Sequence, residues 1–307
     1  MLQELKTENI LSSQYQLRNI FKAREVAEHF YASHFISSEI LTRISEEILD
    51  ELYTYKRKES YNLLEVGMGM GRFTVPFASV LENRFPGSRL YGVDSSIAMI
   101  REAQKSISNI KNIEYNCHDI TDPLPFSGDL FDASLSFYVY HCIKKWRKAL
   151  ENVIQVTAPP NILIFLREYS QWGYHIDNRF SDIEISDATY FDFWKEYFEL
   201  RQITSPLPKI EISASNLDIL IDYLRGRGFK HIHKMLKTTW ERSIDYREVL
   251  TAIELGLFTK LRVGLSGKDR RLLKNKMVDW LNCRNISLNA CHRTIPASIE
   301  IDLFYKE

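Results

Sequence analysis

Short apolar runs recur along the first half of this chain, and each is followed by a longer segment whose apolar residues recur at helical spacing. Runs of strand length that end in polar residues or glycine are typical of buried parallel strands. Their alternation with helices predicts an α/β fold with a mostly parallel sheet. The predicted strands are 63–66, 89–94, 113–120, 131–141 (a range that includes the loop after the strand) and 162–166. The predicted intervening helices are 72–81, 97–106 and 146–156.

The rest of the chain adds helices and two further strands. An amphipathic helix is expected at Ser38–Tyr55, before the first strand. We predict that Thr157–Asn161, which contains Pro159 and Pro160, ends the helix at 146–156. Farther on, Ser266 and Asp269 have the spacing of a helix N-cap. The later predicted helices are 188–201, 213–226 and 266–281, and the later predicted strands are 231–237 and 297–305.

Composition and charge narrow the class of protein. With 307 residues, 45% of them hydrophobic, the chain is long enough for a sizeable core. Forty basic residues balance forty acidic ones, so no global field favours nucleic acid. The N-terminus lacks a signal-peptide pattern, and no apolar stretch is long enough to span a membrane. These features predict a cytoplasmic protein, disfavour a nucleic-acid substrate and leave the oligomeric state open.

The four cysteines carry no metal or disulfide pattern. Cys117, Cys142, Cys283 and Cys291 form no C-x-x-C pair. We interpret them as reduced cysteines of the core, and we expect no metal site because their spacing fits no zinc motif.

A glycine loop follows the first predicted strand. The sequence at 63–71 is L-L-E-V-G-M-G-M-G, so Glu65 precedes Gly67, Gly69 and Gly71. Glycines after a strand let the backbone turn sharply and approach a ligand, because no Cβ intervenes. A strand, a glycine loop and a helix in this order predict a nucleotide-type site at the carboxyl edge of the sheet.

The details of the loop exclude two nucleotide motifs. A dinucleotide fingerprint requires glycine where Arg72 stands, and a phosphate-binding loop requires G-K-[ST]. The E-x-G-x-G-x-G pattern resembles the first motif of class I S-adenosylmethionine-dependent methyltransferases. This resemblance extends over about residues 27–168 and implies a Rossmann-like, seven-stranded mixed sheet with an antiparallel last strand. It also implies S-adenosyl-L-methionine as cofactor and S-adenosyl-L-homocysteine as product.

Later strand ends supply further cofactor residues. Asp94 follows the glycine loop by 23 residues, a spacing that suits a carboxylate accepting hydrogen bonds from both ribose hydroxyls. The segments G-V-D-x-S at 92–96 and D-L-F-D at 129–132 are similar to later motifs of the family. By this resemblance Asp119 accepts from the adenine amine, Ile120 packs on the ring and Glu65 orients the amino group. The cofactor set is completed by Tyr31, Gly67, Gly69, Gly71, Ser95, Met99 and Phe137.

The strand at 131–137 points at the methyl group in this family, so its end should face the acceptor. His141 is the candidate catalytic residue there, since its ordinary pKa suits a general base. It also matches a family position at which histidine is often structural. The substrate-binding candidates are Tyr138, Tyr140, His141, Trp172 and Tyr174.

Two segments leave the minimal fold at strand ends. The insertion at 169–212 is rich in aromatic residues, and a second insertion spans 241–293. Both follow carboxyl ends of strands, so we expect them to form a lid with the N-terminal helices. Lids of this kind enclose small ligands, so we predict a small-molecule acceptor. The predicted division is 1–59 (N-terminal helices and part of the lid), 60–168 (cofactor-binding core), 169–212 (aromatic helical insertion), 213–240 (continuation of the core), 241–293 (helical insertion) and 294–307 (final antiparallel strand).

Two other functions stay open. A tRNA or protein methyltransferase could dock through the basic helix at 268–276. A module that binds the cofactor without turnover would show binding and no methyl transfer. A nicotinamide dehydrogenase is disfavoured by Arg72.

Overall fold

The structure is a computed structural model, and it describes residues 36–107, 110–126, 130–170, 188–204, 217–256 and 265–306. The chain divides into two compact units. The sheet unit takes its described residues from Arg18–Tyr169, Asn216–Thr239 and Ser298–Glu307. The helical unit takes its described residues from Ser170–Ser215 and Trp240–Ala297.

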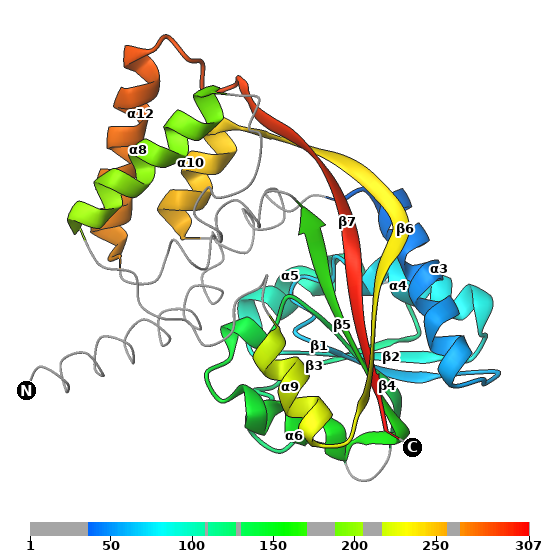
Figure 1. Cartoon of the computed structure of the whole chain (residues 1–307). Coiled ribbons are helices and arrows are strands. Elements are labelled where there is room, and N and C mark those ends of the chain that lie inside the picture. The colour runs from blue at the N-terminus through cyan, green and yellow to red at the C-terminus, as the bar shows by residue number, and fades with distance from the viewer. Residues whose placement is uncertain are drawn as a thin grey trace, which may run out of the picture. The chain divides into compact units, whose positions relative to one another are not determined.

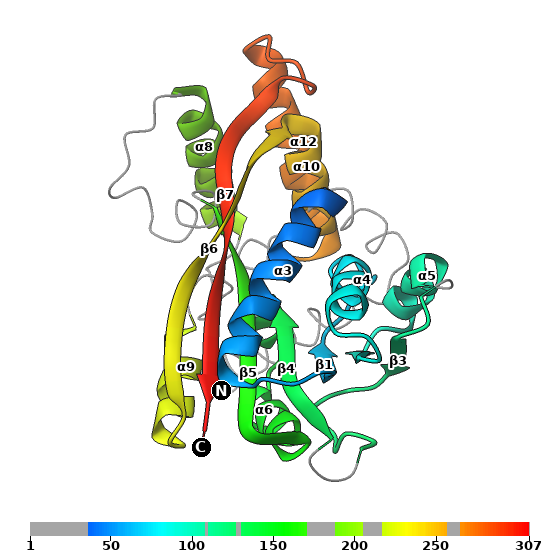
Figure 2. The same cartoon turned by 90° about the vertical axis from the view of Figure 1, so that its right-hand side faces the viewer.

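The described strands form one seven-stranded sheet with the order β3-β2-β1-β4-β5-β7-β6 (Figures 1 and 2). The first five strands along the chain pair in parallel. At the end of β7, the Lys306 N–H donates to the carbonyl of Pro160, near the start of β5, over 2.6 Å, so β7 runs antiparallel. The predicted α/β fold with a mixed sheet is confirmed. The strands are β1 (Asn62–Val66), β2 (Arg89–Asp94), β3 (Ile113–Cys117), β4 (Phe131–Phe137), β5 (Thr157–Ser170), β6 (Lys230–Asp245) and β7 (Cys291–Tyr305).

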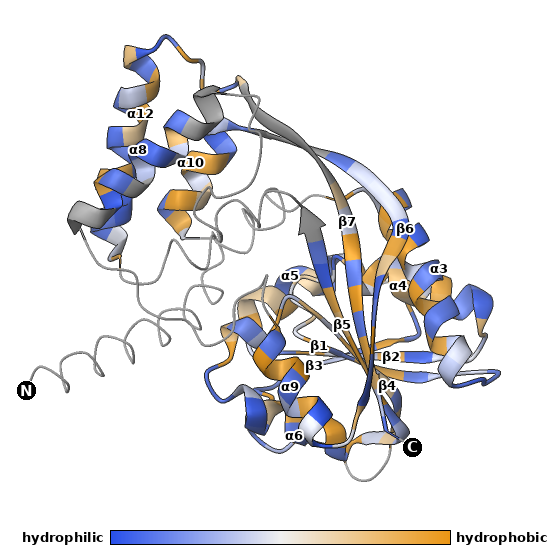
Figure 3. Cartoon of the chain, in the orientation of Figure 1, coloured by the Kyte–Doolittle hydropathy of each residue, from blue (hydrophilic) through white to orange (hydrophobic). Residues whose placement is uncertain are grey.

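Helices cover both faces of the central strands. Figures 1 and 2 show α3, α4 and α5 on one face and α6 and α9 on the other. This cover explains why Phe131–Ser136 of β4 is buried throughout, as expected for a central parallel strand. The helices carry hydrophobic residues toward the sheet and hydrophilic residues elsewhere (Figure 3). Their bounds are α3 (Ser38–Tyr55), α4 (Thr74–Arg84), α5 (Ile97–Ile107), α6 (Trp146–Gln155) and α9 (Asp218–Gly226).

Helix α3 has the bounds that its sequence predicts. The hydroxyl of Ser37 accepts a hydrogen bond from the Ile40 N–H over 3.3 Å, which satisfies one free donor of the first turn. Ile44, Ile48 and Leu52 recur at helical spacing and are buried. At the other side of the helix, the Glu47 carboxylate accepts from the N–H groups of residues 237 and 238 on β6, over 2.7 and 2.8 Å.

Helix α6 ends at Gln155, before Thr157–Asn161, as predicted. The following strand begins earlier than the expected residue 162, because Thr157–Asn161 already belongs to β5, where Thr157 pairs with Phe131. A cis peptide bond joins Pro159 and Pro160, and the pairing with β4 shifts register in this region. A strand can contain proline where the ladder is irregular, because the missing N–H then costs no hydrogen bond.

The last two strands are longer than predicted. β6 continues to Asp245 and β7 begins at Cys291, so the ends of the expected 241–293 helical insertion are extended strand. The compact units divide within both strands, at Thr239–Trp240 and Ala297–Ser298. The helices inside this insertion are α10 (Tyr246–Leu255) and α12 (Gly267–Cys283). The predicted N-cap of α12 is confirmed, since the Ser266 hydroxyl accepts from the Asp269 N–H over 3.1 Å.

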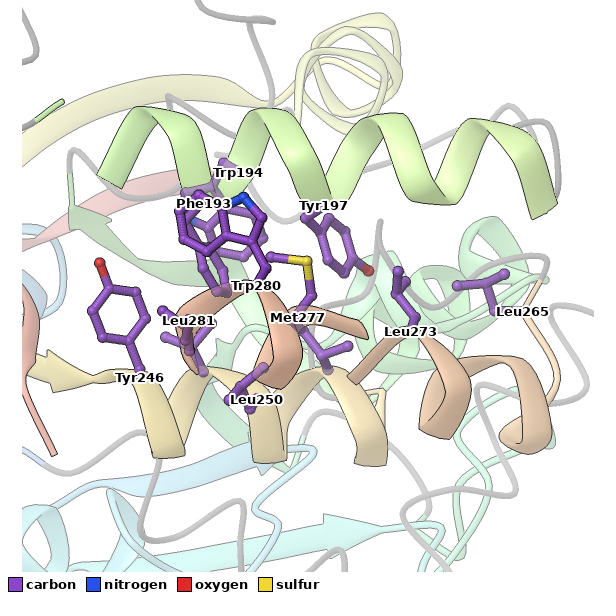
Figure 4. Packing of buried hydrophobic residues seen from close by; sticks show 12 residues of the cluster. Phe193, Trp194, Tyr197, Tyr246, Leu250, Leu265, Leu273, Met277, Trp280 and Leu281 are labelled. Carbon is purple, nitrogen blue, oxygen red and sulfur yellow. The ribbon is translucent and has the colours of Figure 1, made fainter. Parts of the chain in front are cut away.

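The helical unit has a hydrophobic core of its own. Helix α8 (Ala188–Thr204) packs its aromatic face against α10 and α12, as Figure 4 shows. Phe193 is fully buried, and its ring centroid lies 5.3 Å from that of Tyr246 and 5.9 Å from that of Trp280. Met277 is also fully buried and fills the space between the helices. The two insertions therefore join one core although they are far apart in sequence.

A charged cluster links the last three strands of the sheet. The Asp302 carboxylate is fully buried, and its Oδ1 lies 2.8 Å from His231 Nε2 and 3.0 Å from His233 Nδ1. Its Oδ2 lies 3.1 Å from Arg167 Nη2, and the Nε of this arginine lies 3.1 Å from Glu300 Oε2. The arginine and histidine partners compensate the desolvation of a carboxylate inside the sheet.

The cysteine prediction needs correction. Cys117 and Cys283 are exposed, because β3 is an edge strand and Cys283 stands in the last turn of α12. Cys142 is half-buried, and none of these three described cysteines forms a disulfide. Within the described part of the chain, no helix is long and apolar enough to cross a membrane.

Candidate functional site

The parallel register brings four strand ends into one row. Val66 of β1 pairs with Val93 of β2 on one side and with Ser136 of β4 on the other. Val93 in turn pairs with Asn116 of β3. The residues that follow these positions therefore emerge together at the carboxyl edge, the place where open α/β sheets bind ligands.

The glycine loop adopts a backbone conformation that other residues rarely adopt. Gly67, Gly69 and Gly71 have φ values of +71°, +57° and +76°. A Cβ on Gly67 would lie 2.4 Å from Cγ2 of Val139, and one on Gly71 would lie 3.2 Å from Ile107. A Cβ on Gly69 would meet no atom within 4 Å. Val139 thus excludes a Cβ at the first glycine, and Ile107 would crowd one at the third. The second glycine borders open space in which a ligand can approach the backbone.

Asp94 ties the end of β2 to this loop. Its Oδ2 accepts a hydrogen bond from the Gly69 N–H over 2.9 Å, and its Oδ1 accepts from the Ser96 N–H over 2.8 Å. Burial raises the pKa of the Asp94 carboxyl, while the two backbone hydrogen bonds act in the opposite direction. Each carboxylate oxygen keeps a second lone pair, so the group can still accept from a diol.

The residues after Asp94 place the next helix. The Ser96 hydroxyl accepts from the Met99 N–H over 3.3 Å and caps α5. Met99 is buried, whereas Ser95 is exposed. Ser95 stays a prediction for the cofactor set. Ser96 is the residue that contacts Asp94 and caps α5, and an aspartate commonly binds the N–H two residues onward.

Glu65 is a buried carboxyl with an unused acceptor. It is 2% exposed at the end of β1, and its Oε2 has no hydrogen-bond partner among the described residues. Burial raises the pKa of Glu65 to about 8, with the Thr74 side chain opposing the shift and the Asp94 carboxylate adding to it. An unpaired buried acceptor is costly, so this oxygen is suited to receive a donor from a ligand.

A turn after β3 holds Asp119. Its Oδ1 accepts from the backbone N–H and the hydroxyl of Thr121, over 3.0 and 2.9 Å. The neighbouring Ile120 is buried, and its carbonyl accepts from the Asn152 side-chain amide over 2.9 Å. The Asp119 carboxylate is thereby held next to the buried Ile120 side chain. A carboxylate can accept a hydrogen bond from the edge of a flat heterocycle, and an apolar side chain can pack on its face.

The end of β4 carries an unusual backbone at Tyr138. This residue has φ +57°, and its hydroxyl donates to the Glu168 carbonyl over 2.6 Å. The Phe137 ring lies next to those of Phe73 and Tyr138, with centroids 5.9 and 5.0 Å away. A non-glycine residue in the left-handed region is strained, and such strain is concentrated at functional sites.

A short 3-10 helix, η1 (Tyr140–Cys142), follows. His141 is half-buried, with Nε2 3.3 Å from the Cys142 thiol and its ring edge-on to that of Tyr138 at 6.3 Å. Tyr140 is 4% exposed and packs on Phe165 at 5.3 Å, and its burial raises the pKa of the phenol. Tyr140 therefore contributes to the core, and its role in binding the substrate stays a prediction.

Several predicted site residues lie outside the described residues. They are Tyr31, Trp172 and Tyr174. The described glycine, carboxylate and aromatic candidates come together at one edge of the sheet. No group of three metal-ligating side chains occurs among the residues that the structure describes.

The fold and this edge define the class of protein. A seven-stranded α/β sheet with a glycine loop after β1 and carboxylates after β2 and β3 has the architecture of a Rossmann-like methyltransferase. Residues 63–160 match the family model described as "Methyltransferase domain". The core of this chain is therefore a methyltransferase domain of class I type, as the sequence motifs predicted.

Individual relatives are distant. Over 164 residues the chain is 26% identical to malonyl-[acyl-carrier protein] O-methyltransferase 1 of Ilyobacter polytropus, covering 53% of this chain and 50% of that protein. The match thus spans about half the length of this curated relative. Among solved structures, YcgJ of Bacillus subtilis is 17% identical, with 85% of this chain and 98% of that chain covered and a TM-score of 0.46. Phosphoethanolamine N-methyltransferase 2 of Haemonchus contortus is 16% identical, with 94% and 60% covered and a TM-score of 0.48.

Proposed function

We propose that this chain transfers a methyl group from S-adenosyl-L-methionine to a small-molecule acceptor. The observation that carries the proposal is the row of strand ends. It combines the open space at Gly69 with the carboxyls of Glu65, Asp94 and Asp119 at one edge. This set offers separate recognition of an amino acid, a ribose and a base, which are the three parts of the cofactor.

Each part of the cofactor has a fitting partner in the described residues. The unpaired Oε2 of Glu65 suits the amino group, whose donors would satisfy a buried acceptor. The two oxygens of Asp94 suit the ribose diol, and Asp119 with Ile120 suits the adenine edge and face. The Gly69 backbone lets the chain approach closely, since a Cβ would occupy the open space there.

When bound, the cofactor supplies an electrophilic methyl group that an acceptor atom can displace in line. The protein has to align the acceptor, exclude water and remove a proton where the acceptor is a hydroxyl or ammonium. His141 of η1, after the end of β4, is the proposed base. The Tyr138 ring beside it and the Phe137 ring next to Tyr138 suit a sulfonium cation and a flat acceptor.

The proposed lid completes this function. The aromatic insertion at 169–212 and the insertion at 241–293 are proposed to close over the acceptor and keep water away. Their described parts form the helical unit around Phe193 and Met277. Whether the N-terminal helices take part stays a prediction, because residues 1–35 lie outside the described part.

A second candidate acceptor is an acyl group on a carrier protein. The curated relative is named for malonyl-[acyl-carrier protein] as its substrate. The observation that bears on this candidate is the basic helix α12, through which a methyltransferase acting on a protein-bound acceptor could dock.

The proposal is tested on the full chain by titration calorimetry with S-adenosyl-L-homocysteine, followed by transfer of a labelled methyl group to candidate acceptors. Binding together with transfer supports a methyltransferase. Binding without transfer to any acceptor would favour a module that only binds the cofactor. No binding of S-adenosyl-L-homocysteine would overturn the proposal.

A further inference from the structure

One side of helix α12 presents a line of basic side chains around an exposed leucine. Lys268, Leu272 and Lys276 follow one another at four-residue spacing, so they lie in a row along the helix surface. Arg271 stands beside this row. Leu272 is 50% exposed, and the three basic residues are exposed as well. We call these four residues the basic row. Figure 3 shows α12 mostly in hydrophilic colours, which agrees with an outward-facing surface.

The other basic residues of α12 have structural partners. Lys274 forms an ion pair with Glu254 of α10. Arg270 donates to the carbonyls of Glu254 and Leu265 over 3.0 and 2.9 Å. These two residues hold the helical unit together. They show that the helix pairs its inward-facing cations and leaves those of the basic row for other contacts.

The basic row itself is uncompensated. No acidic side chain lies within 4.0 Å of Lys268, Arg271 or Lys276 in the part of the chain that the structure describes. Asp269 beside them is engaged by the Ser266 hydroxyl at 2.6 Å. The pKa of Arg270 is lowered by burial and, after that, by the charge of Arg271, a sign of crowded cations. Alternating charges stabilise an exposed helix face. From Lys268 to Lys276 the charged residues on this side are all cations, and the exposed Asp279 follows beyond its end.

We propose that the basic row docks an acidic helical protein that carries the methyl acceptor. This inference rests on the proposed function and names its partner. The row is about 12 Å long at 1.5 Å per residue, which matches two to three turns of a partner helix. Leu272 at the centre of the row could contact an apolar residue of the partner helix, while carboxylates on either side of that residue pair with the cations of the row. The chain has no net charge, so a local basic surface selects a partner by complementarity and speeds its encounter.

A nucleic acid is the less suitable partner for this surface. Affinity for a phosphate backbone grows with the number of phosphates neutralised, and three exposed cations provide few such contacts. Single-stranded nucleic acid also requires exposed rings for stacking. Trp280, the tryptophan of α12, is 8% exposed and covered by Arg284, whose guanidinium carbon lies 4.0 Å from the ring centroid.

The test uses the full-length chain and a malonylated acyl-carrier protein as the probe. The variant K268E/R271E/K276E is compared with K111E/K148E/K195E, which makes the same change of charge at exposed positions elsewhere. Affinity is measured by fluorescence anisotropy at two salt concentrations, so the readout does not depend on turnover. Thermal melting checks that both variants are folded.

We expect the basic-row variant to lose at least about tenfold in affinity for the carrier and the control to change less than about twofold. Leu272→Ser should weaken binding while keeping the salt dependence, because it removes an apolar contact only. Equal affinities of the two triple variants, or no binding by the wild-type chain, would overturn the proposal. Tighter binding of total tRNA than of the carrier, lost in the basic-row variant, would also overturn it.

Failure of the proposed function has a different outcome. If the chain lacks methyltransferase activity, it transfers no methyl group to free or carrier-bound acceptors, whatever the anisotropy shows. If only the docking inference fails, the chain still transfers methyl groups, and the basic-row variant has the same KM for carrier-bound malonate as the wild type.

Discussion

The Gly69 N–H donates a hydrogen bond to Oδ2 of Asp94 over 2.9 Å, and this contact joins the glycine loop to the end of the neighbouring strand. A second backbone N–H, from Ser96, binds Oδ1 over 2.8 Å. The carboxylate is therefore oriented before any ligand arrives. Preorganised acceptors bind a diol without first giving up conformational freedom.

Removing this carboxylate should weaken cofactor binding sharply. Asp94→Ala is expected to reduce affinity for S-adenosyl-L-homocysteine by at least about tenfold, because two hydrogen bonds to a charged acceptor are worth more than about 1.4 kcal/mol. Asp94→Asn keeps the size of the side chain and isolates the effect of charge. Calorimetry gives both values. An affinity near that of the wild type in Asp94→Ala would contradict the ribose assignment.

Alanine substitutions at Gly67 and Gly69 should have different effects. Gly67→Ala places a Cβ against Val139 and should lower the melting temperature, whereas Gly69→Ala enters open space and should mainly abolish cofactor binding. Each alanine also adds about 1 kcal/mol of strain at positive φ. Melting curves with and without S-adenosyl-L-homocysteine separate the effects.

The matched control is the double variant Gly67→Ala with Val139→Ala. Shortening Val139 removes the methyl group that the new Cβ would meet at 2.4 Å, so part of the lost stability should return. If the double variant is no more stable than Gly67→Ala alone, the clash is not the cause.

The raised pKa of Glu65 predicts that the stability of the folded protein depends on pH. Its pKa in the folded protein is about 8, above the ordinary value of 4.5, so the folded state holds an extra proton between these values. Its contribution to stability is complete below about pH 4.5 and is lost as pH rises through 8, by about 1.4 kcal/mol per pH unit at most. Glu65→Gln should remove this slope. Denaturant unfolding at pH 6, 7 and 8 measures it.

The same group should release a proton when the cofactor binds. An ammonium beside the carboxylate favours the ionised form, so binding at pH 7 should release up to one proton. Calorimetry in buffers of different ionisation enthalpy counts that proton, and Glu65→Gln should not release it. Equal proton release by both proteins would exclude Glu65 as the source.

His141 is expected to act on the acceptor rather than on the cofactor. His141→Gln should reduce kcat by about 10²–10⁴-fold for a hydroxyl or ammonium acceptor and leave S-adenosyl-L-homocysteine affinity unchanged. Cys142→Ser alters the group 3.3 Å from Nε2 and serves as the neighbouring control. If His141→Gln keeps the kcat of the wild type at every pH, the histidine is structural.

The helical unit should depend on the aromatic face of α8. Trp194 is 1% exposed, and Trp194→Ala should cost that unit about 3–5 kcal/mol. Glu199→Ala, at an exposed position of the same helix, is the control. Hydrogen exchange of the α10 and α12 amides provides the measurement. Loss of turnover with intact S-adenosyl-L-homocysteine binding would support the lid proposal, and unchanged turnover would contradict it.

The sequence predicts the carboxyl edge well because local patterns define it. A glycine loop after an apolar run can be recognised from neighbouring residues alone. The same is true of a carboxylate at the end of a predicted strand. The α3 bounds follow from a serine cap and helical spacing for the same reason. Once the strands are parallel, their ends must meet at one edge.

Other features depend on contacts between residues that are far apart in the sequence. Asp302 looks like a solvated strand residue, yet His231 and Arg167 from two other strands bury it. β6 and β7 extend beyond their apolar segments because strands can pair through polar residues. The exposure of Cys117 follows from its place on the edge strand β3, and the order of strands cannot be read from local pattern.

The contact between Glu47 and β6 bears on how this protein behaves at high concentration. β6 is an edge strand, and a free edge is a template for pairing with a strand of another molecule. Here the carboxylate of α3 binds two successive N–H groups, those of residues 237 and 238, so the row of donors along this edge is interrupted there. An incoming strand would have to displace a charged acceptor to pair at this point, so sheet extension is disfavoured along this part of β6.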